Sequence, residues 1–196
     1  MALVETDTDR IGEIIESSTS QFRAETQELN GAPPFGSFVR TSGDPSVYGL
    51  VYHVCTQSME PNRRATAYGM TEQELREEQP QIFELLKTEF EAVIIGFEDS
   101  NGPRQVLPPQ PPGIHRFVYP CSESEVKGLT NSGDFLRSIF SGSRIPVDDL
   151  MIASVRNAWA ARSFDMPYLV KLGKELCRLV RDDYDRLSSI MRRISQ

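Results

Sequence analysis

Apolar and polar residues alternate along much of the first half of the chain and recur at helical spacing in most of the second half. In the segment 21–25, Phe22 and Ala24 alternate with polar side chains, and this period of two is typical of a half-buried strand. Segments of similar character predict further strands at 11–16, 37–41 and 47–55. The run 92–97 is apolar at successive positions, which predicts a central strand buried on both faces.

Two short helices are expected between the last two of these strands. Thr71 is followed three residues later by Glu74, which matches a capping box and predicts a helix through Glu78. Pro80 suits the first turn of a second helix over 81–88, because proline lacks an amide hydrogen that would be unpaired there. The first half is therefore predicted to be a β structure with a short helical insertion.

The second half is predicted to be mostly helical. A helix should begin at Pro146 and end near Arg162, and a long final helix should run from about 167 to 193. The long helix carries one continuous apolar stripe: Leu169, Leu172, Leu176, Val180, Tyr184, Leu187, Met191 and Ile194. Such a stripe either packs on its own domain or pairs between chains like a short coiled coil. The second interpretation makes these side chains candidate partner contacts: Leu176, Val180, Tyr184, Leu187 and Met191.

Glycine and proline punctuate the predicted strands in a regular order. A glycine lies just inside the first strand in the run 11–15, a proline-glycine entry precedes the third in 33–39, and a glycine interrupts the fourth in 48–51. With Phe22 in the second strand, these residues resemble the HAS-barrel family, named for HerA and ATP synthase, over about half of the chain. Glycine lets the strands of a small barrel bend and approach closely, and Gly49 is expected to mark a bulge or a bend.

The resemblance implies a closed barrel of about six strands. We therefore expect an α+β fold with a HAS-like barrel at 8–98, a proline-rich linker at 99–113, and a mainly helical region at 114–196. In HerA-type ATPases and ATP synthase, such barrels stand side by side on a ring, hold subunits in register and perform no chemistry.

A P-loop ATPase domain normally follows this barrel, and the sequence departs from the family there. The chain has one Gly-Lys pair, Gly173-Lys174, but Glu175 follows it and Tyr168 stands where the first glycine of a P-loop belongs. The pair also lies within a predicted helix. ATP hydrolysis is therefore not expected.

Charge is divided unevenly between the two halves. Residues 1–100 hold seven basic and 18 acidic residues, a net charge of −11, whereas residues 101–196 carry a net charge of +4. An acidic half does not bind phosphates by itself, and the basic half suits an acidic partner or a nucleic acid. Acidic residues interleave with the arginines of that half, so nucleic acid is the less favoured partner. An acidic N-terminus and the lack of a long apolar run favour a cytoplasmic protein without a membrane segment.

Few residues suggest chemistry. His53 and Cys55 should share one face of a strand, but two ligands are too few for a metal, and His115 and Cys121 lie beyond the linker. With Cys177 the cysteines are odd in number and widely spaced, so we expect reduced thiols, at least two of them buried. No nucleophile has a base next to it, and we predict no catalytic, cofactor or metal site.

Two charged segments remain candidates for contacts. The helix at 71–78 presents an acidic face that is expected to be solvated, and Arg63 and Arg64 form a basic loop tip suited to a partner carboxylate or a phosphate. The sequence thus predicts a non-catalytic assembly or adapter protein that binds itself, a larger protein complex, or both. The alternatives are an accessory subunit of a DNA-processing motor or nuclease complex, and a small-ligand-binding protein or enzyme.

Overall fold

The computed structural model describes residues 9–140, 145–181 and 183–195. Its strands are β1 (Gly12–Ser17), β2 (Gln21–Thr26), β3 (Phe38–Thr41), β4 (Val47–Ser58), β5 (Leu86–Asp99), β6 (Gly102–Arg104) and β7 (Phe117–Pro120). Its helices are α1 (Glu72–Glu78), the 3-10 helix η2 (Pro80–Leu85), α2 (Glu123–Leu129), α3 (Phe135–Phe140), α4 (Val147–Ala160), α5 (Met166–Leu179) and α6 (Tyr184–Ile194).

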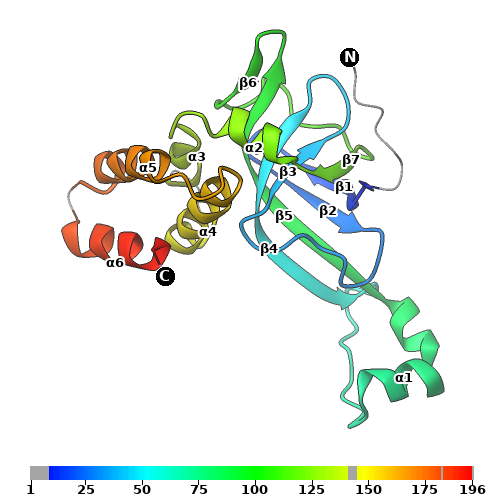
Figure 1. Ribbon diagram of the computed structural model, residues 1–196. Helices are drawn as coiled ribbons and strands as arrows, with labels where there is room; N and C mark the ends of the chain where they lie inside the picture. The colour runs from blue at the N-terminus through cyan, green and yellow to red at the C-terminus, as the bar shows by residue number, and fades with distance from the viewer. Residues whose placement is uncertain (1–8, 141–144, 182, 196) are drawn as a thin grey trace.

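Six antiparallel strands close into a barrel, and the helices α3 to α6 lie to one side of it (Figure 1). The strands follow the order β2-β1-β7-β3-β4-β5, and a further pairing between β2 and β5 closes the ring. The short strand β6 extends beyond the barrel along β5. The predicted α+β class with a small closed barrel of about six strands is therefore confirmed.

The barrel is completed by a strand from beyond the proline-rich segment. β7 pairs with β1 through Gly12 and Val118, and with β3 through Val39 and Pro120. The sequence predicted a barrel that ends at residue 98, but the barrel also includes β7, which lies beyond that boundary. The segment 99–113 is not a free spacer either, because it contributes β6 and buries two of its prolines. Proline has no amide hydrogen to donate to a β-ladder, but its ring can still pack against apolar neighbours.

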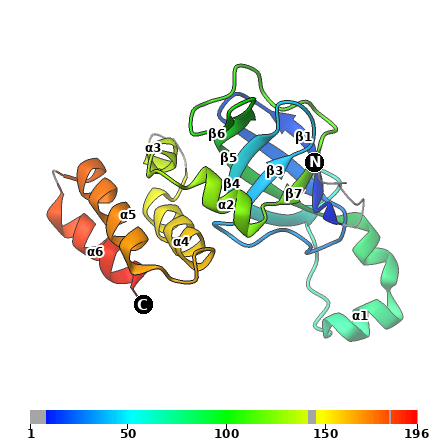
Figure 2. The same cartoon turned by 45° about the horizontal axis from the view of Figure 1, so that its top comes forward.

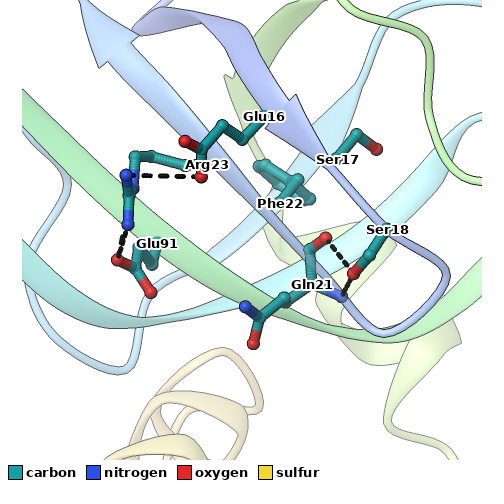
Figure 3. Close-up of a pocket in the computed structure, with 7 residues that line it drawn as sticks. All are labelled: Glu16, Ser17, Ser18, Gln21, Phe22, Arg23 and Glu91. Atoms are coloured by element: carbon teal, nitrogen blue, oxygen red, sulfur yellow. Dashed lines mark hydrogen bonds and ion pairs between the residues drawn. The ribbon is translucent and has the colours of Figure 1, made fainter.

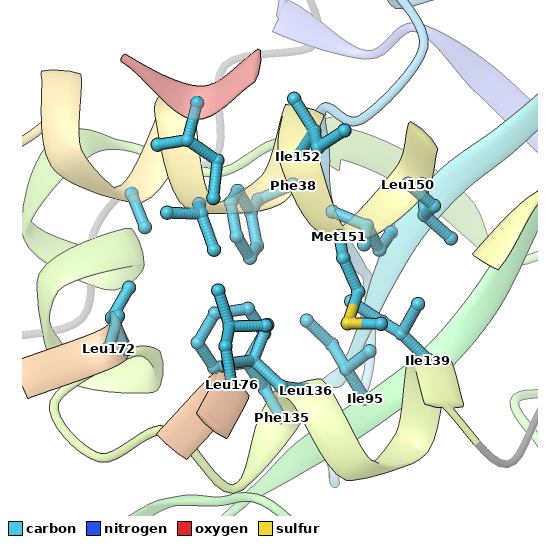
Figure 4. Packing of buried hydrophobic residues seen from close by; sticks show 14 of the residues in the cluster. Phe38, Ile95, Phe135, Leu136, Ile139, Leu150, Met151, Ile152, Leu172 and Leu176 are labelled. Carbon is cyan, nitrogen blue, oxygen red and sulfur yellow. The ribbon is translucent and has the colours of Figure 1, made fainter. Parts of the chain in front are cut away.

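Two apolar cores share the wall formed by β3, β4 and β5. The first fills the barrel and includes Phe22, Val51 and Phe90. The second lies between the outer face of this wall and the C-terminal helices, as Figure 4 shows around Ile95 and Leu176. Successive residues of β5 point alternately into the two cores, which confirms the prediction of a strand buried on both faces.

Glycine has a steric role at two contacts of this wall. The register of β4 against β5 shifts beside Gly49, where a Cβ would lie 2.9 Å from the Phe22 ring. The extra residue is Ile95 of β5, so the bulge lies on the strand opposite the one expected. Gly36 has a φ of +80° and lies against Ala153 of α4. Its carbonyl accepts a hydrogen bond of 2.7 Å from the Asn157 amide, so the barrel and the helices are in close contact.

The long C-terminal helix predicted over 167–193 is wrong. α5 ends at Leu179, with Val180 as its C-cap, and α6 begins at Tyr184. The Asp183 carboxylate caps α6 by accepting the Arg186 amide at 3.0 Å. The break lets α5 and α6 turn back on each other, and both pack against α4, so the apolar stripe is buried from several directions.

The helical insertion agrees with the sequence at its start and differs at its end. The Thr71–Glu74 capping box is present and begins α1 as predicted. The second helix, expected over 81–88, is a 3-10 helix that stops at Leu85. It stops because the next residues pair with β4, where Leu86 lies opposite Ser58.

Candidate functional site

The outer ends of β4 and β5 leave the barrel as a two-stranded ribbon that carries α1 and η2. We call residues 53–87 the arm. No residue of the arm is buried, although every one of them lies in the described part of the chain. Figures 1 and 2 both show α1 at one end of the molecule, with α5 and α6 at the other end.

The arm is held together by local interactions instead of a core. The ladder of β4 and β5 continues outward from Cys55 opposite Glu89 to the last pair, Ser58 and Leu86. Farther out, the Arg76 guanidinium lies 4.2 Å from the centre of the Phe83 ring. Large apolar side chains remain exposed along it: Val54, Met59, Tyr68 and Leu85. A folded element that leaves such side chains in water is typical of a contact surface.

The arm includes two of the residues predicted as partner contacts. Arg63 and Arg64 line a hollow of about 610 Å³ together with Met59 and Lys87. The Arg63 guanidinium lies 3.7 Å from the Glu60 carboxylate, whereas no ion pair of Arg64 occurs among the described residues. Both arginines are exposed, so they are available to an acidic group on a partner.

The other predicted contacts lie far from the arm, in the C-terminal helices. Leu176 and Val180 are buried in the core between the sheet and the helices, and Leu187 and Met191 pack against that core. Tyr184 differs from them, because 80% of its surface is exposed. This packing favours the interpretation in which the stripe lies on its own domain. The two groups of predicted contacts are therefore not brought together within one chain.

A second exposed surface was not expected from the sequence. It lies on the outward face of α5, where Met166, Val170 and Lys174 follow one another at intervals of four residues and are all exposed. Phe164, just before α5, is 60% exposed and stands edge-on to the Trp159 ring at 5.0 Å. The sequence signal was the spacing of these residues between the buried positions of α5.

A polar cluster lies on the barrel wall near the β1–β2 turn (Figure 3). The Arg23 guanidinium contacts the Glu91 carboxylate at 2.7 Å and the Glu16 carboxylate at 3.3 Å. The Tyr52 hydroxyl donates to the other oxygen of Glu91. Tyr52 is the extra residue at a register shift of β4, which explains how the ring reaches across to β5. A cavity of about 120 Å³ adjoins the cluster and is lined in part by Gln21.

The charges of this cluster are fixed at neutral pH. Burial raises the pKa of Tyr52, and its hydrogen bond to Glu91 adds to that effect. Burial alone would raise the pKa of Glu91, but the hydrogen bonds from Tyr52 and Arg23 outweigh it and hold this pKa below its ordinary value. The hydrogen bond to Glu91 raises the pKa of Arg23. General acid–base catalysis needs a group that titrates near the working pH, and these shifts move each group away from neutrality.

The histidines and cysteines do not gather. Among residues 9–140, 145–181 and 183–195 there is no group of three or more His, Cys, Asp and Glu side chains that could hold a metal ion. His53 and Cys55 lie on the arm, whereas His115 contacts Glu13 on the barrel, with Nδ1 and Oε1 2.5 Å apart. The three thiols are free, but the expectation that two are buried is wrong, because Cys55 is only half-buried and Cys177 is exposed.

No protein-family model and no curated protein matches this chain. The resemblance to the HAS-barrel family therefore stays a prediction from the residues, although the barrel that it implied is present. None of the helices in the described ranges is long and apolar enough to span a bilayer.

Proposed function

We propose that this chain is a non-catalytic assembly protein that uses its arm to bind other protein chains. The observation that carries the proposal is the arm itself, a folded segment over 53–87 without a single buried residue. Ordering a backbone costs about 1–2 kcal/mol per residue, and an element without a core recovers little of this by apolar burial. A partner that covers Met59 and Tyr68 would supply the missing burial.

The size of the arm suits this role. A specific protein interface buries about 800 Å² on each partner and involves roughly 20–30 residues a side. The arm offers a segment of that length, with apolar side chains such as Leu85 among charged ones such as Arg64. The fixed charges of Arg23, Tyr52 and Glu91 give further support to a role without acid–base chemistry.

Removal of the arm tests the proposal. Gln57 lies opposite Lys87 in the ladder, so residues 58–86 can be replaced by Asn-Gly, which favours a two-residue hairpin turn. No residue of either core lies in the deleted segment, so the variant should keep its fold by circular dichroism.

The full chain and the arm-deleted variant would each be tagged in the source cell and isolated under gentle conditions. We expect the full chain in a stoichiometric complex, with itself or with other chains, and the folded variant as a monomer by light scattering. A variant that enters the same complex as the full chain would contradict the proposal. So would a full chain that is recovered alone and monomeric.

A further inference from the structure

The helix α1 forms an acidic tip on the arm. α1 holds four glutamates and one arginine, which gives the helix a net charge of −3. Glu72 is paired with Arg76, but Glu77 and Glu78 have no cationic partner among the described residues, and both are exposed. Tyr68 adds an exposed aromatic ring next to this helix. The tip therefore presents unbalanced negative charge together with apolar surface.

The outward face of α5 carries the opposite charge. We call the exposed residues Phe164, Met166, Val170, Lys171, Lys174 and Arg178 the α5 stripe. Its three cations outnumber Glu175, the one acid of α5, so the helix has a net charge of +2. Lys174 has no ion pair in the part of the chain that the structure describes, and it follows Val170 one turn along the helix. The stripe therefore presents unbalanced positive charge together with apolar surface.

The turn before α5 holds Phe164 outward. Ser163 and Phe164 have φ values of 52° and 60°, a left-handed conformation that residues other than glycine disfavour. The Phe164 amide donates to the Trp159 carbonyl at 3.0 Å, and the Trp159 indole donates to the Asp165 carbonyl at 3.0 Å. These bonds fix a strained turn that keeps an aromatic side chain in water, which is typical of a functional contact.

The arm and the α5 stripe lie at opposite ends of the molecule in both views, so they do not meet within one chain (Figures 1 and 2). We infer that the occupant of the α5 stripe is the arm of a second copy. This inference rests on the proposed function and names its partner. The contact joins two different surfaces, so repeated association is head-to-tail, and it gives a ring if the rotation closes and a filament if it does not.

Charge complementarity is the reason to choose a second copy. The chain itself carries both members of the pair, the exposed glutamates of α1 and the exposed cations of α5. Opposite charges steer such surfaces together, and like charges disfavour contact between two α1 helices or between two α5 stripes. The apolar side chains on each surface, Tyr68 on one and Phe164 on the other, would be removed from water in the same contact.

A charge exchange tests the contact. The arm variant carries Glu77→Lys and Glu78→Lys, and the stripe variant carries Lys174→Glu and Arg178→Glu. Sedimentation velocity at low salt should show that each variant raises the dissociation constant of self-association about tenfold or more, because like charges then face each other. Combining all four substitutions should restore association. Glu28→Lys, an exposed charge change on the barrel, is the control and should leave sedimentation unchanged.

Mixing two variants tests the head-to-tail arrangement. The arm-deleted variant keeps its α5 stripe, and the stripe variant keeps its arm. Each should be monomeric alone, and the mixture should form a one-to-one dimer that grows no further. An arm-to-arm contact would instead let the stripe variant dimerise alone and give no mixed dimer, and this result would overturn the inference.

The remaining outcomes separate the inference from the proposed function. If the wild-type chain assembles and neither charge reversal weakens it, the inference is wrong and the assembly function stands. If the wild-type chain is monomeric at about 100 μM and low salt, a second copy is not the occupant, and the capture experiment alone decides the function. All variants should unfold close to the thermal transition of the wild type, because every substituted side chain is exposed. The one ion pair that is lost among the described residues, between Arg178 and Glu175, is a surface pair within one helix and contributes little stability.

Discussion

Gly36 approaches Ala153 so closely that a Cβ on Gly36 would lie 2.4 Å from the Ala153 Cβ. The two residues join the loop before β3 to the middle of α4. Gly36 also has a φ of +80°, which L-residues with a side chain disfavour. We expect Gly36→Ala to lower the free energy of unfolding by about 1–3 kcal/mol, since strain and a steric clash act together.

A double-mutant cycle with Ala153→Gly separates the two causes. Ala153→Gly alone should cost about 1 kcal/mol from helix propensity. If the clash contributes, the double variant should be more stable than the sum of the two single losses predicts, as measured by urea denaturation. Strictly additive losses would mean that the close approach has no energetic role.

Leu176 should behave as a core residue and not as a contact between chains. Its side chain is fully buried among the C-terminal helices and the sheet. We expect Leu176→Ala to lower the free energy of unfolding by about 2–5 kcal/mol, because it leaves a cavity. Tyr184→Ala, at an exposed position of the same predicted stripe, is the control and should change stability by about 0.5 kcal/mol or less. Equal effects at the two positions would contradict the observed packing.

Asp148 and Arg186 should be energetically coupled across α4 and α6. The Asp148 Oδ1 atom accepts hydrogen bonds from Arg186 Nε at 2.9 Å and from Nη2 at 2.6 Å. Both side chains are about one-third exposed, so we expect a coupling energy of about 0.5–1 kcal/mol from a double-alanine cycle. Arg192→Ala on α6, which has no ion pair in the described residues, should be uncoupled from Asp148→Ala. A coupling energy near zero for Asp148 and Arg186 would show that the pair adds no stability.

The Glu91 carboxylate should make stability depend on acidic pH. Its pKa in the folded chain lies below the ordinary value of 4.5, so its contribution is present above the unfolded pKa and is lost as the pH falls through the folded pKa. The stability advantage of the wild type over Glu91→Gln should therefore be full at pH 6 and should shrink below about pH 4.5. Urea denaturation from pH 3 to pH 7 measures it. An advantage that stays constant would show that the contacts with Arg23 and Tyr52 do not depend on the charge of Glu91.

The strands of the barrel could be predicted because each short segment carries its own signal. Phe22 and Ala24 alternate with polar residues, and Gly49 lies at a shift of the β4–β5 register, although the extra residue there belongs to β5. The strand β7 was harder to assign to the barrel, because its pairing with Gly12 and Val39 joins positions far apart in the sequence. Long-range pairing of this kind leaves little trace in local patterns.

The C-terminal helix was mispredicted because two local signals competed. The apolar spacing continues past Val180, whereas Asp183 can end the run by capping a new helix. The spacing of apolar residues does not show that the chain turns back. The break is favoured because it lets both helices pack on α4. The first residues of β5 were missed in a similar way, although the alternation of Lys87 and Glu89 with Thr88 and Phe90 was a strand signal.

The candidate contacts were predicted in part. Arg63 and Arg64 stood out as a basic loop tip, and the structure places them on the exposed arm. The α5 stripe could not be predicted, because exposure of Val170 follows from which face of α5 the neighbouring helices cover. A sequence gives the spacing of a helix face, but the surrounding packing decides which face meets water.

β4 and β5 stay paired from the two cores into the arm, with a bulge at Tyr52 where the arm begins. The arm is therefore a rigid extension of the fold and not a flexible linker, because its base is the wall that the barrel and the helices share. A force on the outer end of the arm would be transmitted along the hydrogen-bonded strands β4 and β5 to both cores. A partner bound to the arm would thus be held at a fixed distance and orientation relative to the barrel.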